Sequence, residues 1–248
     1  MSRFRIIPTL LLKQRAICKG IRFSHHTYVG DPINTVKLFN DLNADELLIL
    51  NIDSNNEIKS PDYQFLQSML KHTFIPVTYG GGINKFDHAQ KLFSIGVDRI
   101  VLHAVLFSNA SLISEIASVY GNQSVVACIN VKNDGYVWLN PSHKKSIAVL
   151  DWAKMLEQEG VGEIVVQSID REGTYFGLDE KLIDQLSHQL QIPLIISGGA
   201  SSFQDIEKAR RFGASGVSVG SMFMYKRPHR AVLIQYPDSK TLDQVFHD

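Results

Sequence analysis

The sequence lacks several features that would place it in a specialised class of protein. Its 248 residues include only two cysteines, Cys18 and Cys128, which are too few for a disulfide framework or a cysteine-based zinc site. The 17 glycines and 8 prolines are too few for a collagen-like or low-complexity chain, and a hydrophobic content of 44% excludes disorder. No apolar run approaches the ~20 residues that a membrane helix needs.

An excess of charge of one sign is also missing. Lys and Arg together number 25, and so do Asp and Glu, so the formal net charge is zero. Nucleic-acid affinity depends on neutralising phosphates, and this balance gives no electrostatic reason for it. The first residues enter an apolar stretch with no small-residue cleavage site behind it. We therefore expect a cytoplasmic protein that binds neither nucleic acid nor membrane.

Short β-branched runs alternate with longer amphipathic stretches. Helical spacing of apolar residues predicts helices within Asp31–Leu42 and Leu150–Gln158. Helix starts are indicated at Asp31-Pro32, at Ser60-Pro61-Asp62 and at Ser202. Eight strands are predicted, at Arg5–Leu12, Glu46–Ile52, Ile75–Tyr79, Arg99–His103, Ser124–Val131, Glu163–Ser168, Leu194–Ser197 and Gly216–Val219. Most are continuously apolar, as buried parallel strands are, so we expect a single α/β domain over residues 1–248 that forms a (βα)₈ TIM barrel.

An internal repeat supports the barrel. Ile75–Gly82 resembles Ile192–Gly199 at an offset of 117 residues. The same offset pairs Phe86 with Phe203 and Gly96 with Gly213, and it also pairs Glu46 with Glu163 and Ile52-Asp53 with Ile169-Asp170. A period this long indicates two fused (βα)₄ halves and not a solenoid.

Three segments fit this pattern less well. Long insertions, read as loops, follow the first strand of each half at Lys13–Gly30 and Lys132–Lys145. After Val219 the chain has an unusual tail, and the last barrel helix is predicted to be short, over Thr241–Phe246. Both insertions lie at the face where βα loops build barrel active sites.

Two glycine turns are the best local signals of a binding site. Gly80-Gly81-Gly82 and Ser197-Gly198-Gly199 each follow a strand and precede a helix, where open backbone N–H groups can approach a phosphate. The next strand of each half ends in His103-Ala104 and in Gly220-Ser221. The duplication favours an elongated ligand with a phosphate at each end, held more strongly by the second half. The alternative is that the glycines only make tight turns.

The segment Ser168–Thr174 offers further candidates. Asp170 is a possible acid or base, and Gly173 with Thr174 could donate hydrogen bonds to a ligand. Equally, Asp170 could pair with Arg171 or cap the next turn. Lys19, in the first insertion, could reach over the mouth, although a lone loop lysine is usually solvated.

Metal and cofactor signals are weak. His25 and His26 are adjacent on a predicted loop, where both cannot easily bind one ion, and no carboxylate lies at a metal-like spacing. Sequence patterns for nucleophile elbows, zinc proteases and P-loops do not occur. We expect neither a metal nor a cofactor.

Several motifs together resemble HisF, the cyclase subunit of imidazole glycerol phosphate synthase. The matching segments are Arg5-Ile6-Ile7, Lys19-Gly20, Gly30-Asp31-Pro32, Asp45-Glu46-Leu47, Tyr79–Ile83, Gly162-Glu163-Ile164, Ser168–Thr174 and Ser197–Ala200. The resemblance extends to about Phe223. It implies a (βα)₈ barrel that binds a substrate with two phosphates and uses ammonia from a HisH-type glutaminase on the opposite face.

The resemblance breaks at the chemistry. HisF needs two aspartates, near the ends of the first and fifth strands, and these positions are Leu11 and Asn130 here. A further acidic position is Asn51, and His103-Ala104 replaces a polar pair that helps to hold one phosphate. Leucine cannot transfer a proton and an amide has no useful pKa, so the resemblance implies a protein without the cyclase acids.

The ammonia-handling end keeps more of the family pattern. The family's ring of four charged residues at the barrel bottom maps to Arg5, Glu46, Arg99 and Gln167. Asp98 and Gln123 match positions at the glutaminase interface. The alternative is that charges at a barrel bottom only solvate it.

The loss of the cyclase acids together with the retained floor residues makes the chain similar to HisF-like paralogues of surface-polysaccharide gene clusters. Those work with a HisH-like glutaminase and a sugar amidotransferase that makes acetamidino sugars, and the tail around Leu233–Pro237 resembles that branch. The first hypothesis is an ammonia conduit without cyclase activity. The others are a divergent cyclase of histidine biosynthesis that uses Asp170 or Asp53 with Lys19, and a sensor of a phosphorylated small molecule.

Overall fold

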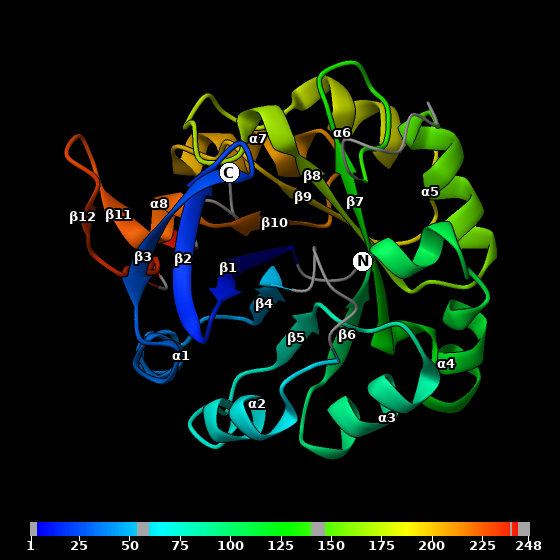
Figure 1. Ribbon diagram of the computed structural model, residues 1–248. Helices are drawn as coiled ribbons and strands as arrows, with labels where there is room; N and C mark the ends of the chain where they lie inside the picture. The colour runs from blue at the N-terminus through cyan, green and yellow to red at the C-terminus, as the bar shows by residue number, and fades with distance from the viewer. Residues whose placement is uncertain (1–3, 54–59, 140–146, 239, 243–248) are drawn as a thin grey trace.

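The computed structural model describes residues 4–53, 60–139, 147–238 and 240–242. Its eight parallel strands close into a barrel through the pairing of β1 with β10, and helices cover the outside (Figure 1). The barrel strands are β1 (Arg5–Lys13), β4 (Leu47–Asn51), β5 (Val77–Gly80), β6 (Arg99–Leu102), β7 (Val125–Val131), β8 (Glu163–Ser168), β9 (Leu194–Ser197) and β10 (Gly216–Val219). The predicted (βα)₈ barrel and its eight strands are confirmed.

The main helices fill the connections between these strands. They are α1 (Pro32–Asp41), α2 (Tyr63–Leu70), α3 (Phe86–Ser94), α4 (Leu112–Tyr120), α5 (Val149–Gln158), α6 (Glu180–Ser187) and α7 (Phe203–Arg211), with short 3₁₀ turns at Ala104–Phe107, Asn122–Ser124 and Ile169–Arg171. The predicted helix starts are confirmed by capping. The Asp31 carboxylate accepts from Asn34 N, Asp62 caps α2, and Ser202 with Asp205 forms a capping box. None of the helices described is long and apolar enough to cross a membrane.

The first insertion is not a loop. Lys13–Gly30 forms an antiparallel extension of the barrel sheet, in which β2 (Ala16–Ile21) pairs with the end of β1, and β3 (Ser24–Gly30) pairs with β2. The two turns place Gln14-Arg15 and Arg22-Phe23 at positive φ. Hairpin turns of this kind usually contain Asn or Gly, so the sequence carried no turn signal here. Of the second insertion, residues 140–146 lie outside the described residues.

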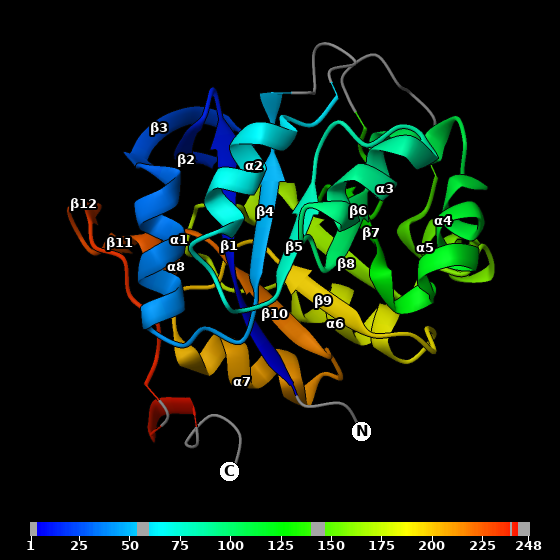
Figure 2. The same cartoon turned by 90° about the horizontal axis from the view of Figure 1, so that it is seen from below.

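After β10 the described part of the chain departs from the regular strand–helix pattern. After β10 a single helical turn, α8 (Ser221–Met224), leads into a hairpin of β11 (Tyr225–Lys226) and β12 (Ala231–Val232), which projects from the barrel wall (Figure 2). The chain then returns to the barrel, where the Tyr236 hydroxyl donates to Ile6 O (3.0 Å) and accepts from Asp45 N (3.3 Å). A short last helix was predicted for Thr241–Phe246. Residues 240–242 are helical, and residues 243–246 lie outside the described residues.

The barrel interior is arranged in layers, because alternate residues of each strand point inward. Four charged side chains close the amino-terminal end. Above them lies an apolar layer of Ile7, Leu48, Val101, Val126, Cys128, Val165 and Ile195. Hydroxyl groups follow nearer the mouth, where Thr9 hydrogen-bonds Ser218 and Ser218 donates to Ser197 (3.2 Å). The interior is therefore packed between a charged floor and a polar mouth.

Candidate functional site

The floor of the barrel is a closed ring of two arginines and two glutamates. Arg5 contacts Glu46 (2.9 Å) and Glu163. Arg99 contacts Glu163 (2.9 Å) and Glu46, and Thr78 donates a further hydrogen bond to Glu46 (2.7 Å). Burial alone would lower the pKa of Arg5, but the carboxylates of Glu163 and Glu46 raise it above its ordinary value. We call Arg5, Glu46, Arg99 and Glu163 the floor ring.

The structure corrects one predicted member of this ring. Gln167 was expected in the fourth place, but Glu163 occupies it, and Gln167 hydrogen-bonds Glu172 near the mouth. Both residues lie on β8 and both point inward. They are four residues apart, and a strand rises about 3.3 Å per residue, so Gln167 lies roughly 13 Å further along the strand from the floor.

A hollow of about 660 Å³ opens on the floor face next to the ring. Asp98 and Gln123, the predicted interface residues, line it together with the aromatic rings of Phe93 and Tyr120. The Asp98 carboxylate also accepts from Val77 N (2.8 Å), which fixes it at the start of β5. The floor face therefore offers a concave surface with polar and aromatic groups beside the ring.

At the mouth, the second-half candidates converge on one small pocket. Gly173, Gly198, Gly199, Gly220 and Ser221 line it, with Glu172 and Tyr175, which the sequence did not single out. The buried hydroxyl of Ser221 has no hydrogen-bond partner among the described residues. A buried unpaired hydroxyl is costly, so it suits a pocket that receives a polar ligand. Thr174 does not line this pocket, because its hydroxyl donates to Arg171 O (2.7 Å).

The glycines here are required by close approach. A Cβ at Gly198 (φ +101°) would lie 2.6 Å from Ser168 O, and one at Gly199 (φ +97°) would meet the carbonyl of Gly177. At Gly220 a Cβ would lie 2.5 Å from Lys19 Nζ. Glycine is therefore required at these positions so that the loops around the pocket can pack against one another and against Lys19.

Lys19 and Glu172 form a buried pair of opposite charge beside this pocket. Lys19 is 1% exposed and its ammonium donates to Thr9 O (2.5 Å), so the solvated lysine considered from the sequence is not what the structure shows. Burial lowers the pKa of Lys19, against the opposing effect of Glu172. Burial likewise raises the pKa of Glu172, against the effect of Lys19. Glu172 could not be predicted as a partner of Lys19, because it lies 153 positions further along the chain in an irregular segment.

His103, a candidate of the first half, is hydrogen-bonded to other residues of the barrel. His103 Nδ1 lies 2.8 Å from Cys128 O and must donate to it, so the neutral ring accepts from Asn130 Nδ2 at Nε2 (3.0 Å). Burial lowers the pKa of His103, which favours this neutral form. The Asn130 carbonyl accepts from the Cys128 thiol (3.7 Å), whose pKa burial raises to about 12. Both ring nitrogens are used internally, and Gly81, Gly82 and His103 do not line the second-half pocket.

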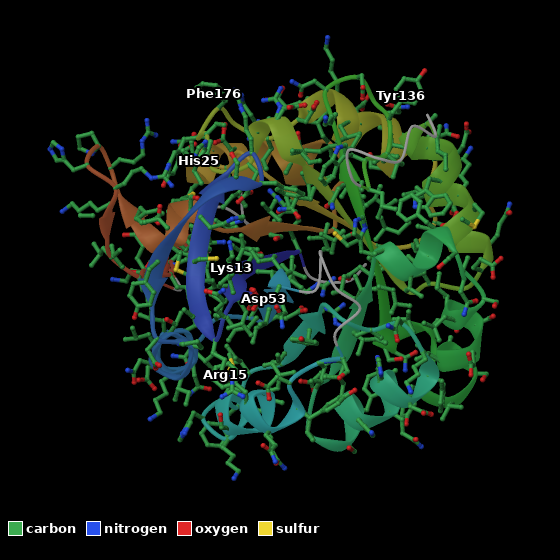
Figure 3. The ribbon with its side chains drawn as sticks, viewed as in Figure 1. Lys13, Arg15, His25, Asp53, Tyr136 and Phe176 are labelled. Carbon is green, nitrogen blue, oxygen red and sulfur yellow. The ribbon has the colours of Figure 1, made fainter. Side chains whose placement is uncertain are left out.

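The remaining acid candidates are held by backbone groups. Asp170 accepts from Asn133 N (2.8 Å), which is neither the Arg171 pair nor the cap considered from the sequence. Asp53 accepts from Gln14 N and lies next to Lys13 at the mouth (Figure 3). Leu11, at the first of the two degenerate acid positions, is 7% exposed and pairs with Cys18 of β2.

Comparison with known proteins agrees with this architecture. The family model described as "Histidine biosynthesis protein" matches residues 5–229. The name "Putative imidazole glycerol phosphate synthase subunit" is carried by hisF2 of Pseudomonas aeruginosa (39% identical, covering 98% of this chain and 99% of the relative) and by HisF of Leptospira interrogans (37%, covering all of both). The imidazole glycerol phosphate synthase subunit HisF of Wolinella succinogenes is 34% identical over 90% of both chains. With its two-half barrel, glycine turns and charged floor, the chain belongs to the HisF-like family of histidine-biosynthesis barrel proteins.

Proposed function

We propose that this chain is a HisF-like subunit that accepts ammonia at the barrel floor and passes it on without cyclising a substrate itself. The ammonia would come from a HisH-type glutaminase and would serve a separate sugar amidotransferase. The observation that carries the proposal is the state of the mouth, where Leu11 and Asn130 occupy the two acid positions.

A proton-transfer role for Asn130 is opposed by its contacts. Its amide donates to His103 and accepts from the Cys128 thiol, so both ends of the amide are engaged by neighbouring side chains. Leu11 has no proton to give. The carboxylates of Asp53 and Asp170 lie at the mouth, but both accept from backbone N–H groups of the loops. General acid–base catalysis needs a titratable group, and neither of the two acid positions of the family supplies one here.

The floor supports the docking of a glutaminase. The hollow beside the floor ring contains Asp98 and Gln123, and the ring blocks the barrel interior with paired charges. The layer above the ring is apolar apart from the Cys128 thiol, which is bonded to Asn130, and such a layer suits the passage of a small neutral molecule better than that of an ion. Ammonia fits this description and ammonium does not.

An active cyclase is the second candidate, favoured by a different observation. Lys19 and Glu172 are a buried titratable pair beside the pocket that contains the Ser221 hydroxyl, and perturbed buried pairs occur often at active sites. In this reading Glu172 or Asp170 would replace the missing acids in imidazole glycerol phosphate synthase chemistry.

Turnover of the purified protein separates the two. The assay supplies the phosphoribulosyl formimino substrate of the cyclase with excess ammonium salt, which removes the need for a glutaminase, and the Wolinella succinogenes HisF serves as the positive control. We expect no turnover from the folded protein. A rate near that of the control would overturn the conduit proposal. A HisH-type glutaminase should still bind the chain, and Asp98→Lys should weaken that binding.

Restoring the acids is a weaker test. The double variant Leu11→Asp/Asn130→Asp would place a carboxylate 3.0 Å from His103 Nε2, where it would pair with a protonated ring. We therefore expect the double variant to recover trace turnover only when His103 is also replaced by a group that cannot be protonated.

A further inference from the structure

Two segments of the chain contain no acidic residue. From Lys13 to Gly30 and from Gly220 to Tyr236 there is neither Asp nor Glu, while seven of the 25 Lys and Arg residues occur there. The rest of the chain holds 18 basic residues against 25 acidic ones. The formal net charge of zero is therefore the sum of +7 on these two segments and −7 on the rest of the chain.

The fold brings both segments to the same side of the barrel. The β2–β3 extension and the β11–β12 hairpin lie on one flank in both views (Figures 1 and 2). They also contact the same loop, since Arg22 N donates to Glu172 O (2.9 Å) and the Arg227 guanidinium lies 5.0 Å from the ring centre of Tyr175. We call this surface the basic flank and define it by Arg22, Tyr28, Lys226, Arg227, Val232 and Leu233, all of which are exposed.

The cations of the basic flank are not neutralised locally. Within the part of the chain that the structure describes, Arg22, Lys226 and Arg227 form no ion pair. Arg15, at the far turn of the same extension, differs because it contacts Asp62 (2.6 Å). Unpaired exposed charges of one sign create a field that reaches about 8 Å at physiological ionic strength.

Apolar side chains are exposed on the same surface. Tyr28 is 64% exposed, Val232 51% and Leu233 46%. Charged residues on a sheet edge commonly prevent edge-to-edge aggregation, which would explain the cations but not three exposed apolar groups among them. A nucleic-acid backbone would likewise engage the cations alone. Apolar and aromatic groups mixed with arginine are typical of protein interfaces.

We propose that the basic flank is a docking surface for a second protein, which binds through an acidic surface of its own. Complementary charge would steer the encounter, and Tyr28, Val232 and Leu233 would be buried on contact. The flank is separate from the floor hollow at Asp98 and Gln123, so a floor partner and a flank partner can bind together. This inference goes beyond the proposed function and does not depend on ammonia transfer.

Crosslinking at two flank positions tests the proposal in the organism that carries the gene. The photo-crosslinking amino acid benzoylphenylalanine replaces Tyr28 in one variant and Leu233 in another. The control replaces Val119, which is 62% exposed on α4, on the other side of the barrel (Figure 1). We expect both flank positions, and not position 119, to crosslink the same protein through Asp- and Glu-rich peptides.

Charge reversal with the purified crosslinked protein completes the test. Lys226→Glu/Arg227→Glu should weaken its binding at least tenfold, and the wild-type affinity should fall as salt rises. Lys71→Glu/Lys181→Glu changes two exposed lysines elsewhere by the same total charge and should have less than a twofold effect. The proposal is overturned by equal effects of the two double variants, or by flank adducts that are absent, nonspecific, with nucleic acid or with a second copy of this chain.

Discussion

At the floor of the barrel two buried glutamates and two partly exposed arginines compensate each other, whereas at the mouth a single lysine and a single glutamate lie at the pocket that contains the Ser221 hydroxyl. Each floor arginine contacts both floor glutamates, so the ring is satisfied without a ligand. At the mouth, Lys19 uses a backbone carbonyl and the Ser221 hydroxyl has no partner among the described residues. The charges of the floor ring compensate each other, whereas the mouth keeps a hydroxyl that a polar ligand could engage.

The largest effect should follow from breaking the floor ring. Glu163→Gln leaves two arginines to share Glu46, and uncompensated buried charge is costly. The floor glutamates are 5% exposed but the arginines keep about a fifth of their surface in water, so we expect the free energy of unfolding to fall by roughly 2–3 kcal/mol. Urea denaturation measures it.

Gln167→Ala is the matched control on the same strand. It removes one hydrogen bond to Glu172 and should cost about 1 kcal/mol. A larger loss for Gln167→Ala than for Glu163→Gln would restore Gln167 to the ring and contradict the description of the floor.

The error over Gln167 shows where sequence reasoning reaches its limit. Continuous apolar runs such as Ser124–Val131, together with the 117-residue offset, were sufficient to predict the barrel. Parallel strands buried on both faces have this distinctive apolar pattern. Glu163 and Gln167 have the same inward parity on β8, so periodicity alone cannot tell which one meets the arginines. That depends on the height of each residue along the strand, which is a property of the assembled barrel.

A smaller effect should distinguish the two halves of the mouth. Ser221→Ala removes the unpaired hydroxyl, and we expect inorganic phosphate to bind about tenfold more weakly, since one hydrogen bond to a charged group is worth roughly 1.5 kcal/mol. Ala104→Ser adds a hydroxyl at the corresponding first-half position. It should leave the affinity unchanged, because both nitrogens of the neighbouring His103 ring are already bonded. Isothermal titration calorimetry measures both.

Ser221→Ala is a better test of the pocket than Gly199→Asp, the substitution that the glycine turns first suggest. A Cβ at Gly199 would collide with the Gly177 carbonyl and the residue has a φ of +97°, so Gly199→Asp would disturb the loop as well as the pocket. Equal phosphate affinity in Ser221→Ala and wild type would show that the pocket does not bind phosphate through this hydroxyl.

What the sequence missed at the mouth has a local cause. The β2–β3 extension buries Lys19, yet its turns at Gln14-Arg15 and Arg22-Phe23 use residues that rarely adopt positive φ. Without Asn or Gly, the segment resembles a loop, and a loop lysine is expected in water. Glu172 was not predicted either, because its interaction with Lys19 requires Lys19 to be buried.

The smallest effect concerns the pH dependence of the first half. Burial lowers the pKa of His103, so in mildly acidic solution the unfolded chain binds a proton more readily than the folded one. The stability contributed by the neutral ring is present above the ordinary histidine pKa of about 6.5 and is lost as pH falls toward the lowered value.

His103→Gln keeps a donor and an acceptor but cannot be protonated. Between pH 7.5 and pH 5 the wild type should therefore lose more stability than His103→Gln, by at most about 2 kcal/mol, the limit set by 1.36 kcal/mol per pH unit below the ordinary histidine pKa; urea denaturation at each pH measures it. His26 and His88, whose pKa values burial also lowers, are present in both proteins and cancel in the comparison. Parallel pH profiles would mean that burial does not keep His103 in its neutral form, and the account of a first half closed by the neutral His103 ring would fail.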